Sequence, residues 1–485
     1  MVRVLPVLYV LAFVILILAG FMVIPLLISL WIEDAATTAH QKSIGITSLA
    51  GLVLWAITRR HKRELQTRDG FLLVSLVWTA LPAFATLPLL MQLPGLSFTD
   101  AYFETVSGLT TSGATVLTGL DQLPASINLW RGLLIWLGGM GIIVLAVAIL
   151  PLLGVGGSQV FKAETPGPMK DNKLTPRITQ TAKGLWLVYL FITVACVLSM
   201  KLAGMNWVDA FMHAFSTMGL GGFSTHDDSF GYFNSPAIEA VTIVFMLIAG
   251  INFATHFLLF RGAGLGVYRR DPEVPLFLAV MAVSVVGIAV YLLVRGAYPD
   301  FWTALRFSAF NVVSIATTTG FANTDFNLWP AFAPVLMLFL SCFSTCSGST
   351  GGGIKMIRAR LMFHQALREM TRIVHPRAQI PVKVSGVTVE NNIIFAVLAF
   401  MLMYGGTVIA ATMLLSLSDL DIVTAFSATI ACINNMGPGL NQVGPATTYA
   451  VLTDFQTWIC TIVMLLGRLE LFTLVVVFTP SFWRR

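Results

Sequence analysis

The sequence predicts an all-α polytopic membrane protein with about ten spans, built from four similar helical units and an additional N-terminal helix pair. Three observations predict this class: few charged residues, long apolar runs and an internal repeat. Only 11% of the 485 residues are charged and 56% are hydrophobic, whereas about 25% of a soluble domain is charged. This composition excludes a disordered chain, a secreted disulfide scaffold and an ordinary cytosolic enzyme.

Apolar runs that can span a membrane follow one another along the chain. A hydrocarbon core about 30 Å thick requires about 20 apolar residues of helix. The first run, between Arg3 and Glu33, contains no charged residue. It is too long for a signal-peptide core and lacks a small-residue cleavage motif, so we expect a retained membrane helix. The other expected spans lie near residues 44–58, 71–93, 132–153, 184–204, 237–260, 275–294, 330–347, 391–416 and 455–480.

Basic residues divide the loops into two sets. One set comprises both termini and the loops 59–69, 154–183, 261–273 and 355–390; it holds 23 of the 29 Lys and Arg residues but only 8 of the 23 Asp and Glu residues. Because Lys and Arg are retained on the cytoplasmic side, we expect both termini to be cytoplasmic. Basic loops beside membrane spans also explain the pI near 9.1 without a nucleic-acid partner.

Cysteine and histidine spacing supports no metal or disulfide chemistry. The five cysteines show no CxxC pair, and the histidines show no HxxxH pair. We therefore expect buried, inert thiols rather than a disulfide framework or a zinc site. A membrane enzyme would require a cluster of His, Asp or Glu at one membrane face, and the sequence offers none.

Four shorter apolar stretches, each too short to cross a membrane, lie between full spans near 100–112, 208–221, 302–319 and 421–435. Each leads into a loop with a glycine. In the first, second and fourth copies an alanine precedes this glycine by 12 residues; in the third, Ser314 precedes it by six, as serines do in the first two copies. The glycines are Gly113, Gly222, Gly320 and Gly437. We expect an N-terminal helix pair at 1–69 and repeats at 70–160, 161–262, 263–375 and 376–485.

The repeated unit favours a cation pore. Irregular backbone at membrane depth is tolerated only where it is buried in protein or lines a watery cavity. A helix that stops half-way directs the partial negative charge of its C-terminal end at the membrane interior, and the following loop can present carbonyl oxygens to a cation. Glycines that serve only close packing are the alternative. Four glycines at matched offsets after half-length helices favour a pseudo-fourfold arrangement around one ion pore.

These loops resemble those of the TrkH/KtrB/HKT superfamily of potassium transporters, and most closely its bacterial TrkH branch. The resemblance covers nearly the whole chain, including the N-terminal helix pair, and rests on 110–115, 220–224, 317–321 and 434–440. It implies a potassium selectivity filter of backbone carbonyl groups, with K⁺ held at Thr111, Leu220, Thr318 and Asn435. The implied filter residues are Thr110, Thr111, Ser112, Gly113, Leu220, Gly221, Gly222, Thr318, Thr319, Gly320, Asn435, Met436 and Gly437. Because the four copies differ in sequence, we expect weaker discrimination among potassium, rubidium and sodium than in a four-chain potassium channel.

The expected span at 330–347 runs into a segment rich in glycine, serine and threonine, residues 344–355. Three consecutive glycines there cannot form a stable helix interior, since each costs about 1 kcal/mol relative to alanine. A phosphate-binding GxxxxGK[ST] loop is not formed, because Ile354 stands where lysine is required. The resemblance implies a flexible intramembrane gate beneath the filter, and its residues are Ser347, Gly348, Gly351, Gly352 and Gly353.

Arg468 lies within the last apolar run, and a mid-membrane arginine indicates function by default. Glu470 would lie about 200° around the same helix, so the two side chains cannot pair directly. The resemblance implies that Arg468 points into the pore beneath the filter, where its charge would oppose cations. The alternative is a structural arginine held by loop carbonyls, and the two interpretations are compatible.

Two groups of aspartates accompany the repeats. We expect the first group to cap the N-termini of the half-length helices: Asp100, Asp209, Asp300 and Asp421. The second group lies in the expected outer loops, where it either raises the local cation concentration or is simply solvated: Asp121, Asp227, Asp228, Asp325 and Asp454.

The resulting functional hypothesis is potassium uptake across the bacterial cytoplasmic (inner) membrane through a gated, channel-like pore. K⁺ is the transported ion, and no organic cofactor is expected in this chain, which has no GxGxxG fold. The resemblance implies a homodimer that contacts membrane lipid and a cytoplasmic TrkA-like, nucleotide- and NAD-binding regulatory subunit, which we expect on the loops 154–183 and 355–390. The alternative is a proton- or sodium-coupled potassium symporter, although coupled carriers usually contain two inverted repeats.

Overall fold

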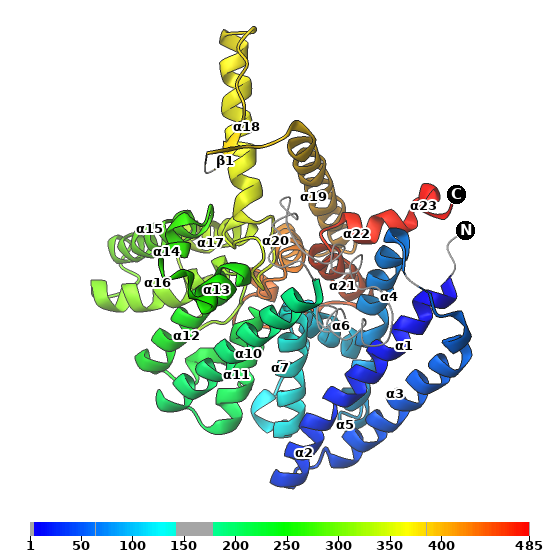
Figure 1. Ribbon diagram of the computed structural model, residues 1–485. Helices are drawn as coiled ribbons and strands as arrows, with labels where there is room; N and C mark the ends of the chain where they lie inside the picture. Colours follow the sequence, from blue (N-terminus) through cyan, green and yellow to red (C-terminus); the bar gives the residue numbers. More distant parts are fainter. Residues whose placement is uncertain (1–3, 64, 142–177, 385, 485) are drawn as a thin grey trace.

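The computed structural model describes residues 4–63, 65–141, 178–384 and 386–484. Almost all regular structure in this part is helical (Figure 1). The exception is a two-stranded antiparallel pair, β1 (Lys383–Val384) and β2 (Val387–Thr388). The chain is therefore an all-α protein, as its composition predicts.

The N-terminal helices lie along one side of the molecule (blue in Figure 1). Helix α1 packs against both α3 and α4, which joins the N-terminal pair to the first repeated unit. Valine and leucine side chains on α1, such as Val10 and Leu18, are fully buried in this contact. The helices are α1 (Val4–Phe21), α2 (Val23–Ile32) and α3 (Thr37–Thr58).

The first two repeated units follow. Each has a half-length helix, which we call a pore helix, between longer helices. Unit 1 contains α4 (Thr67–Ala85), α5 (Leu87–Gln92), the pore helix α6 (Phe98–Leu109) and α7 (Ala125–Gly139). Unit 2 contains α10 (Ile178–Leu202), the pore helix α11 (Trp207–Gly219), α12 (Pro236–Ala249), α13 (Phe253–Leu258), a π-helical turn (Leu259–Ala263) and α14 (Gly266–Arg270).

The last two units have the same order of helices. Unit 3 contains α15 (Val274–Val294), the pore helix α16 (Phe301–Ala316), α17 (Phe332–Phe343) and α18 (Met356–Val374). Unit 4 contains α19 (Asn391–Leu417), the pore helix α20 (Ile422–Ile433), α21 (Asp454–Arg468), α22 (Phe472–Val475) and α23 (Pro480–Trp483). Helix α18 projects from the bundle (Figure 1).

The four units close into a pseudo-fourfold ring through their second long helices. Helix α7 packs on its own pore helix α6 and on the next pore helix, α11. In the same way α12 packs on α11 and α16, α17 packs on α16 and α20, and α21 packs on α20 and α6. Each pore helix is therefore held between two long helices from different units, and the last unit returns to the first.

Not all of the ten expected spans form single straight helices. By length and composition, five helical stretches of the described chain can cross a membrane. Two further pairs of helices pass the same test only when taken together, and they are bent by 92° and 105°. The bends follow α12 and α21. Helix α17 ends at Phe343, where the polar 344–355 segment begins. The expected span 132–153 begins within α7, but residues 142–153 lie outside the described part.

The prediction that an aspartate caps the N-terminus of each pore helix is correct for two of the four helices. Asp300 and Asp421 do cap their helices, accepting hydrogen bonds from the backbone N–H groups of Thr303 and Thr424. Asp100 and Asp209, however, are the third helical residues, and the caps of those two helices are Ser97 and Asn206. The polar cap thus recurs in all four units, but the aspartates of the first two units belong to the first turn, where a negative charge still favours the helix dipole.

Candidate ion-conducting site

The loops after the four pore helices meet around one axis. We call residues 110–115, 220–225, 317–322 and 435–440 the ring segments. A Cβ atom placed on Gly113 would lie 2.8 Å from the backbone nitrogen of Gly222, and one on Gly222 would lie 2.7 Å from the carbonyl oxygen of Thr319. One on Gly320 would overlap the carbonyl oxygen of Met436, and one on Gly437 would lie 2.8 Å from the carbonyl oxygen of Ser112. Each glycine thus faces the backbone of the next unit, and the fourth returns to the first.

All four pore helices end in the same way. In unit 1 the N–H of Thr111 donates to the carbonyl of Gly108 (2.9 Å) and the N–H of Ser112 to that of Ser107 (2.8 Å). The other units repeat this pair of bonds, which is the Schellman pattern of a helix C-terminus. The turning residue has a positive φ of 52–62°, although in no copy is it a glycine: Thr111, Leu220, Thr318 and Asn435. These are the positions predicted to hold K⁺, so the structure gives them one shared backbone conformation.

The ring segments are not chemically equivalent. Hydroxyl pairs recur in units 1 and 3, between Thr110 and Ser112 and between Thr317 and Thr319, each at 2.8 Å. The amide of Asn435 bridges unit 4 to unit 1 by donating to Ser112 Oγ (2.9 Å). Three carbonyl groups of the predicted set accept protein hydrogen bonds: that of Gly221 from Phe223 N–H, that of Thr319 from Gly222 N–H, and that of Gly437 from the Tyr449 hydroxyl (2.8 Å).

A buried ion pair lies behind the first ring segment. Glu104 on α6 and Arg131 on α7 approach to 2.8 Å with side chains only 1% exposed. Glu104 accepts hydrogen bonds from Thr115 Oγ1 and Val116 N–H, both at 3.0 Å. Arg131 also donates to the Ser224 carbonyl in the second ring segment (3.1 Å). This pair was not predicted from the sequence, although a glutamate within an expected half-length helix was a detectable signal.

The 344–355 loop lies against the ring from one side. Its Gly352 N–H donates to Thr318 Oγ1 (2.8 Å), and a Cβ on Gly352 would overlap the Asn434 carbonyl oxygen. Its Thr350 hydroxyl donates to the Met218 carbonyl at the end of α11 (2.9 Å). The loop therefore contacts units 2, 3 and 4. Gly348 and Gly353 in this loop have a positive φ, and Ser347 N–H donates to Glu273 (3.1 Å). The loop therefore contains the other predicted gate residues: Ser347, Gly348, Gly351 and Gly353.

Arg468 completes this contact for unit 1. It is the last residue of α21, at the 105° bend, rather than a residue in mid-helix. Its guanidinium donates to Thr111 Oγ1 (3.2 Å), the Thr350 carbonyl (3.0 Å) and the Gly138 and Gly139 carbonyls. These contacts are those of the alternative interpretation, an arginine held by carbonyl groups, and they lie between the first ring segment and the 344–355 loop. Glu470 pairs instead with Arg358 (2.6 Å).

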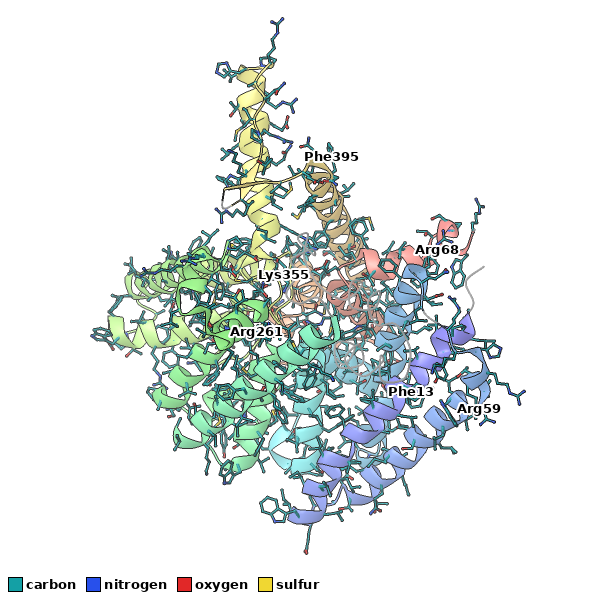
Figure 2. The ribbon with its side chains drawn as sticks, in the orientation of Figure 1. Phe13, Arg59, Arg68, Arg261, Lys355 and Phe395 are labelled. Carbon is teal, nitrogen blue, oxygen red and sulfur yellow. The ribbon has the colours of Figure 1, made fainter. Side chains whose placement is uncertain are left out.

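Lys355 adds a second positive charge at the loop, and unlike the partly buried Arg468 it is almost fully buried. Its side chain is 4% exposed and donates to the Gly351 carbonyl and to Ser349 Oγ (3.5 Å). Figure 2 shows it where α18 joins the bundle. Lys355 was predicted only as one of the basic loop residues; a lysine two residues after three consecutive glycines was the available signal.

On the other side of the ring, a polar cluster joins the loops that follow the first two ring segments. His226 contacts both Asp121 and Asp209, the latter at 3.4 Å. Burial opposes the charge on His226, but these two carboxylates outweigh it and raise its pKa above the ordinary 6.5. Asp227 accepts hydrogen bonds from the Gly119 and Leu120 N–H groups, and Asp325 from that of Asn327. Three of the five aspartates predicted in the outer loops therefore have a role in loop structure: Asp121, Asp227 and Asp325.

A closed ring of half-helices and loops inside a membrane bundle defines a multi-pass membrane transport protein. The TrkH family, described as a cation transport protein, matches residues 37–485. The chain is 46% identical to the Trk system potassium uptake protein TrkH of Salmonella typhimurium strain LT2 over 467 residues, 96% of each chain. It is 36% identical to the Trk system potassium uptake protein TrkG of Escherichia coli strain K12 over 461 residues, 95% of this chain and 94% of that one.

A solved structure agrees with these relatives. The crystal structure of the potassium transporter TrkH from Vibrio parahaemolyticus matches with a TM-score of 0.90 at 42% identity, covering 100% of both chains. The chain therefore belongs to the TrkH family, which is a family of transporters and not of enzymes.

Proposed function

We propose that this chain takes up potassium ions through the ring segments, with selectivity for K⁺ and Rb⁺, and that the 344–355 loop and Arg468 gate the passage. The observation that carries the proposal is the cyclic contact of Gly113, Gly222, Gly320 and Gly437. Such a ring brings four helix C-termini and their carbonyl groups to one axis, which favours a dehydrated cation. The Trk potassium uptake proteins among the relatives supply the choice of potassium.

The gate proposal is supported by charge and by contact. Arg468 and Lys355 are two positive groups in or against the loop that covers one side of the ring. In a partly dehydrated passage, a fixed positive charge raises the energy of a cation. The loop contacts the turning residue Thr318 directly, through Gly352, and the turning residue Thr111 through Arg468. Displacement of the loop would therefore open that side of the ring.

The distribution of charges supports a proposal for the position of the protein in the cell. We propose the bacterial cytoplasmic membrane, with both termini and α18 on the cytoplasmic side. We also propose a homodimer and a TrkA-like regulatory subunit on the basic surface; of the two expected landing loops, 355–390 is described except for residue 385, whereas 154–177 lies outside the described residues. The segments 1–69, 70–160, 161–262, 263–375 and 376–485 are the proposed units.

The test is tracer-ion flux into liposomes, with potassium, rubidium and sodium compared at varied voltage and without a proton or sodium gradient. We expect potassium and rubidium to enter faster than sodium. Gly320→Ala should reduce this preference, because both its φ of 93° and the Met436 carbonyl exclude a side chain. Gly287→Ala is the matched control, since a Cβ there meets nothing within 4 Å. Unchanged selectivity in Gly320→Ala would contradict the filter, and flux that requires a second ion's gradient would favour the symporter.

A further inference from the structure

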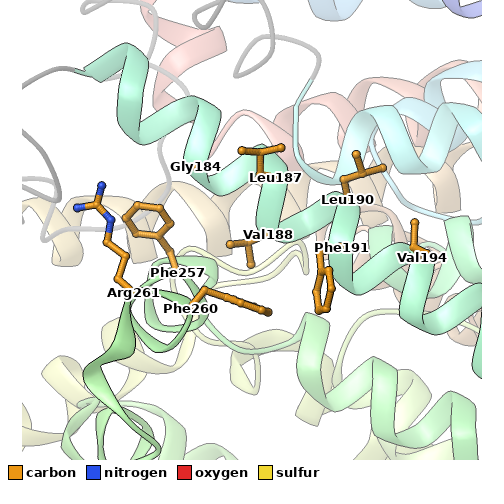
Figure 3. Close-up of a pocket in the computed structure, with 9 residues that line it drawn as sticks. All are labelled: Gly184, Leu187, Val188, Leu190, Phe191, Val194, Phe257, Phe260 and Arg261. Atoms are coloured by element: carbon orange, nitrogen blue, oxygen red, sulfur yellow. The ribbon is translucent and has the colours of Figure 1, made fainter.

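An open apolar groove lies between α10 and the segment formed by α13 and the π-helical turn (Figure 3). Its volume is about 640 Å³, which is within the range of about 300–1,000 Å³ for ligand pockets. The lining is aliphatic and aromatic except at one end, where Arg261 lies beside Phe257, far from Val194 at the other end (Figure 3).

The groove is apolar but not filled by the described side chains. Leu187 and Phe191 on α10 are 66% and 60% exposed, and Phe260 is 53% exposed. Gly184 allows Phe257 to pack directly on α10, since a Cβ there would overlap the Phe257 ring. Between membrane helices such a surface faces hydrocarbon, so a chain-like apolar ligand fits along it.

One basic side chain, Arg261, lines the groove, and it lies at one end (Figure 3). The guanidinium of Arg261 lies 4.8 Å above the Phe257 ring, which holds it at the mouth. Further basic residues are near the groove in the sequence: Lys183 directly precedes Gly184, and Arg269 and Arg270 end α14. The neighbouring Asp271 accepts hydrogen bonds from Thr255, Glu273 and Val274, so its carboxylate is directed into the protein.

We propose that this groove is a binding site for one anionic phospholipid, with an acyl chain along α10 and the phosphate at Arg261. A guanidinium binds phosphate oxygens in a bidentate manner, and basic pockets between membrane helices on the cytoplasmic side bind anionic headgroups. The choice of the cytoplasmic leaflet rests on the proposed orientation of the chain. The site itself is independent of the transported ion.

The test is native mass spectrometry of the full-length protein, purified in detergent and titrated with phosphatidylglycerol or phosphatidylcholine. We expect the wild type to bind one phosphatidylglycerol with preference, and Arg261→Ala to weaken this binding about tenfold, the loss expected for one charge-assisted contact. Arg295→Ala is the matched control, because Arg295 also lies over an aromatic ring four residues earlier, Tyr291, but outside the groove.

A second pair of variants tests the acyl chain. Leu187→Trp fills the groove and should weaken phosphatidylglycerol binding, whereas Val283→Trp, at a 73% exposed position on α15, should not. Equal binding of phosphatidylglycerol by wild type and Arg261→Ala would overturn the proposal. Equal retention of phosphatidylcholine and phosphatidylglycerol by the wild type would also overturn it. If Arg261→Ala changed only the monomer–dimer ratio, the occupant of the groove would be a second copy of the chain, and the lipid proposal would be wrong.

Discussion

At the scale of single residues, the shape of the ring depends on side chains that do not line it. Glu104 and Arg131 are buried behind the first ring segment and connect it to the second through Ser224. A buried ion pair gives little net stability compared with apolar packing, but loss of one partner leaves an uncompensated charge. The pair therefore holds the geometry of two ring segments more than it stabilises the fold.

We predict that Glu104→Gln lowers the free energy of unfolding by about 3–5 kcal/mol and reduces potassium-over-sodium selectivity, because Arg131 loses its counter-charge. Thermal unfolding and tracer flux are the measurements. Glu369→Gln is the control: its pair with Arg372 is 49% exposed on both sides, and the change should be below about 1 kcal/mol. Wild-type selectivity in a stable Glu104→Gln protein would show that the pair does not position the ring.

His226 makes the loops next to the ring sensitive to pH. Its pKa is raised because Asp209 and Asp121 outweigh its burial, and the pKa of Asp121 is lowered because hydrogen bonds from His226 and Asp227 outweigh partial burial. The charged histidine therefore stabilises this junction fully below pH 6.5, and the contribution is lost as pH rises through the raised pKa. It is lost again as pH falls through the lowered pKa of Asp121, which is below 3.8.

We accordingly predict that wild type exceeds His226→Asn in melting temperature by more at mildly acidic pH than at alkaline pH. The neighbouring His213, whose ring lies 6.5 Å from that of His226, is unsuitable as a control. Both of its ring nitrogens are hydrogen-bonded within the same cluster, Nδ1 to the Asp209 carbonyl and Nε2 to Ser224. The control is His364→Asn, which lies away from the cluster on the projecting α18. A difference between wild type and His226→Asn that does not change with pH would exclude the charged pair.

At the scale of elements, the broken helices determine where movement is possible. The second long helix of unit 3 is interrupted at 344–355, and those of units 2 and 4 bend sharply. The loop and the unit 2 bend are hydrogen-bonded to each other, from Cys346 N–H to the Gly250 carbonyl (3.1 Å) and from Phe253 N–H to the Gly348 carbonyl (3.0 Å). The three breaks therefore form one contiguous layer beneath the ring.

We predict that Arg468→Ala, or deletion of Gly351–Gly353, raises basal potassium flux of the isolated chain about tenfold or more. At an effective dielectric constant of about 20, two unit charges about 4 Å apart repel by about 4 kcal/mol, and each 1.36 kcal/mol of barrier is about tenfold in rate. The controls are Arg295→Ala and Gly406→Ala, the latter on α19 with open space at its Cβ. Wild-type flux in both Arg468→Ala and the Gly351–Gly353 deletion would contradict the gate proposal.

At the scale of the whole molecule, the overall charge of +6 is divided unevenly between two sets of loops. We expect the basic loops on the cytoplasmic side of the membrane and the aspartates of the ring loops on the other side. The five native cysteines are buried, so introduced cysteines can report the orientation. Phe363 on α18 is 64% exposed, and Leu328 in the loop after the third ring segment is 83% exposed.

We predict that an impermeant thiol reagent labels Phe363→Cys only in inside-out vesicles and Leu328→Cys only in intact cells. The unsubstituted protein, with its buried cysteines, is the control for background labelling. The opposite pattern would reverse the proposed orientation, and with it the leaflet assigned to the lipid groove.

Local patterns in the sequence predicted much of this protein. Half-length apolar stretches before matched glycines predicted the pore helices and the ring residues, because helix length and chain reversal are local properties. Three glycines after a polar run likewise predicted the break at 344–355. The third copy matched less well than the others, since α16 has 16 residues whereas the other pore helices have 12 or 13.

The sequence by itself determined the class of protein, and it predicted the repeat, the four ring glycines and a functional site at Arg468. Only the tertiary structure decided the cyclic order of the ring contacts, the Glu104–Arg131 pair, the inward turn of Lys355 and the position of Arg468 at a bend. The physical reason is separation along the chain: Arg468 contacts Thr111 across 357 residues and Thr350 across 118. No local pattern encodes such a contact, because it exists only once all four units have closed around one axis.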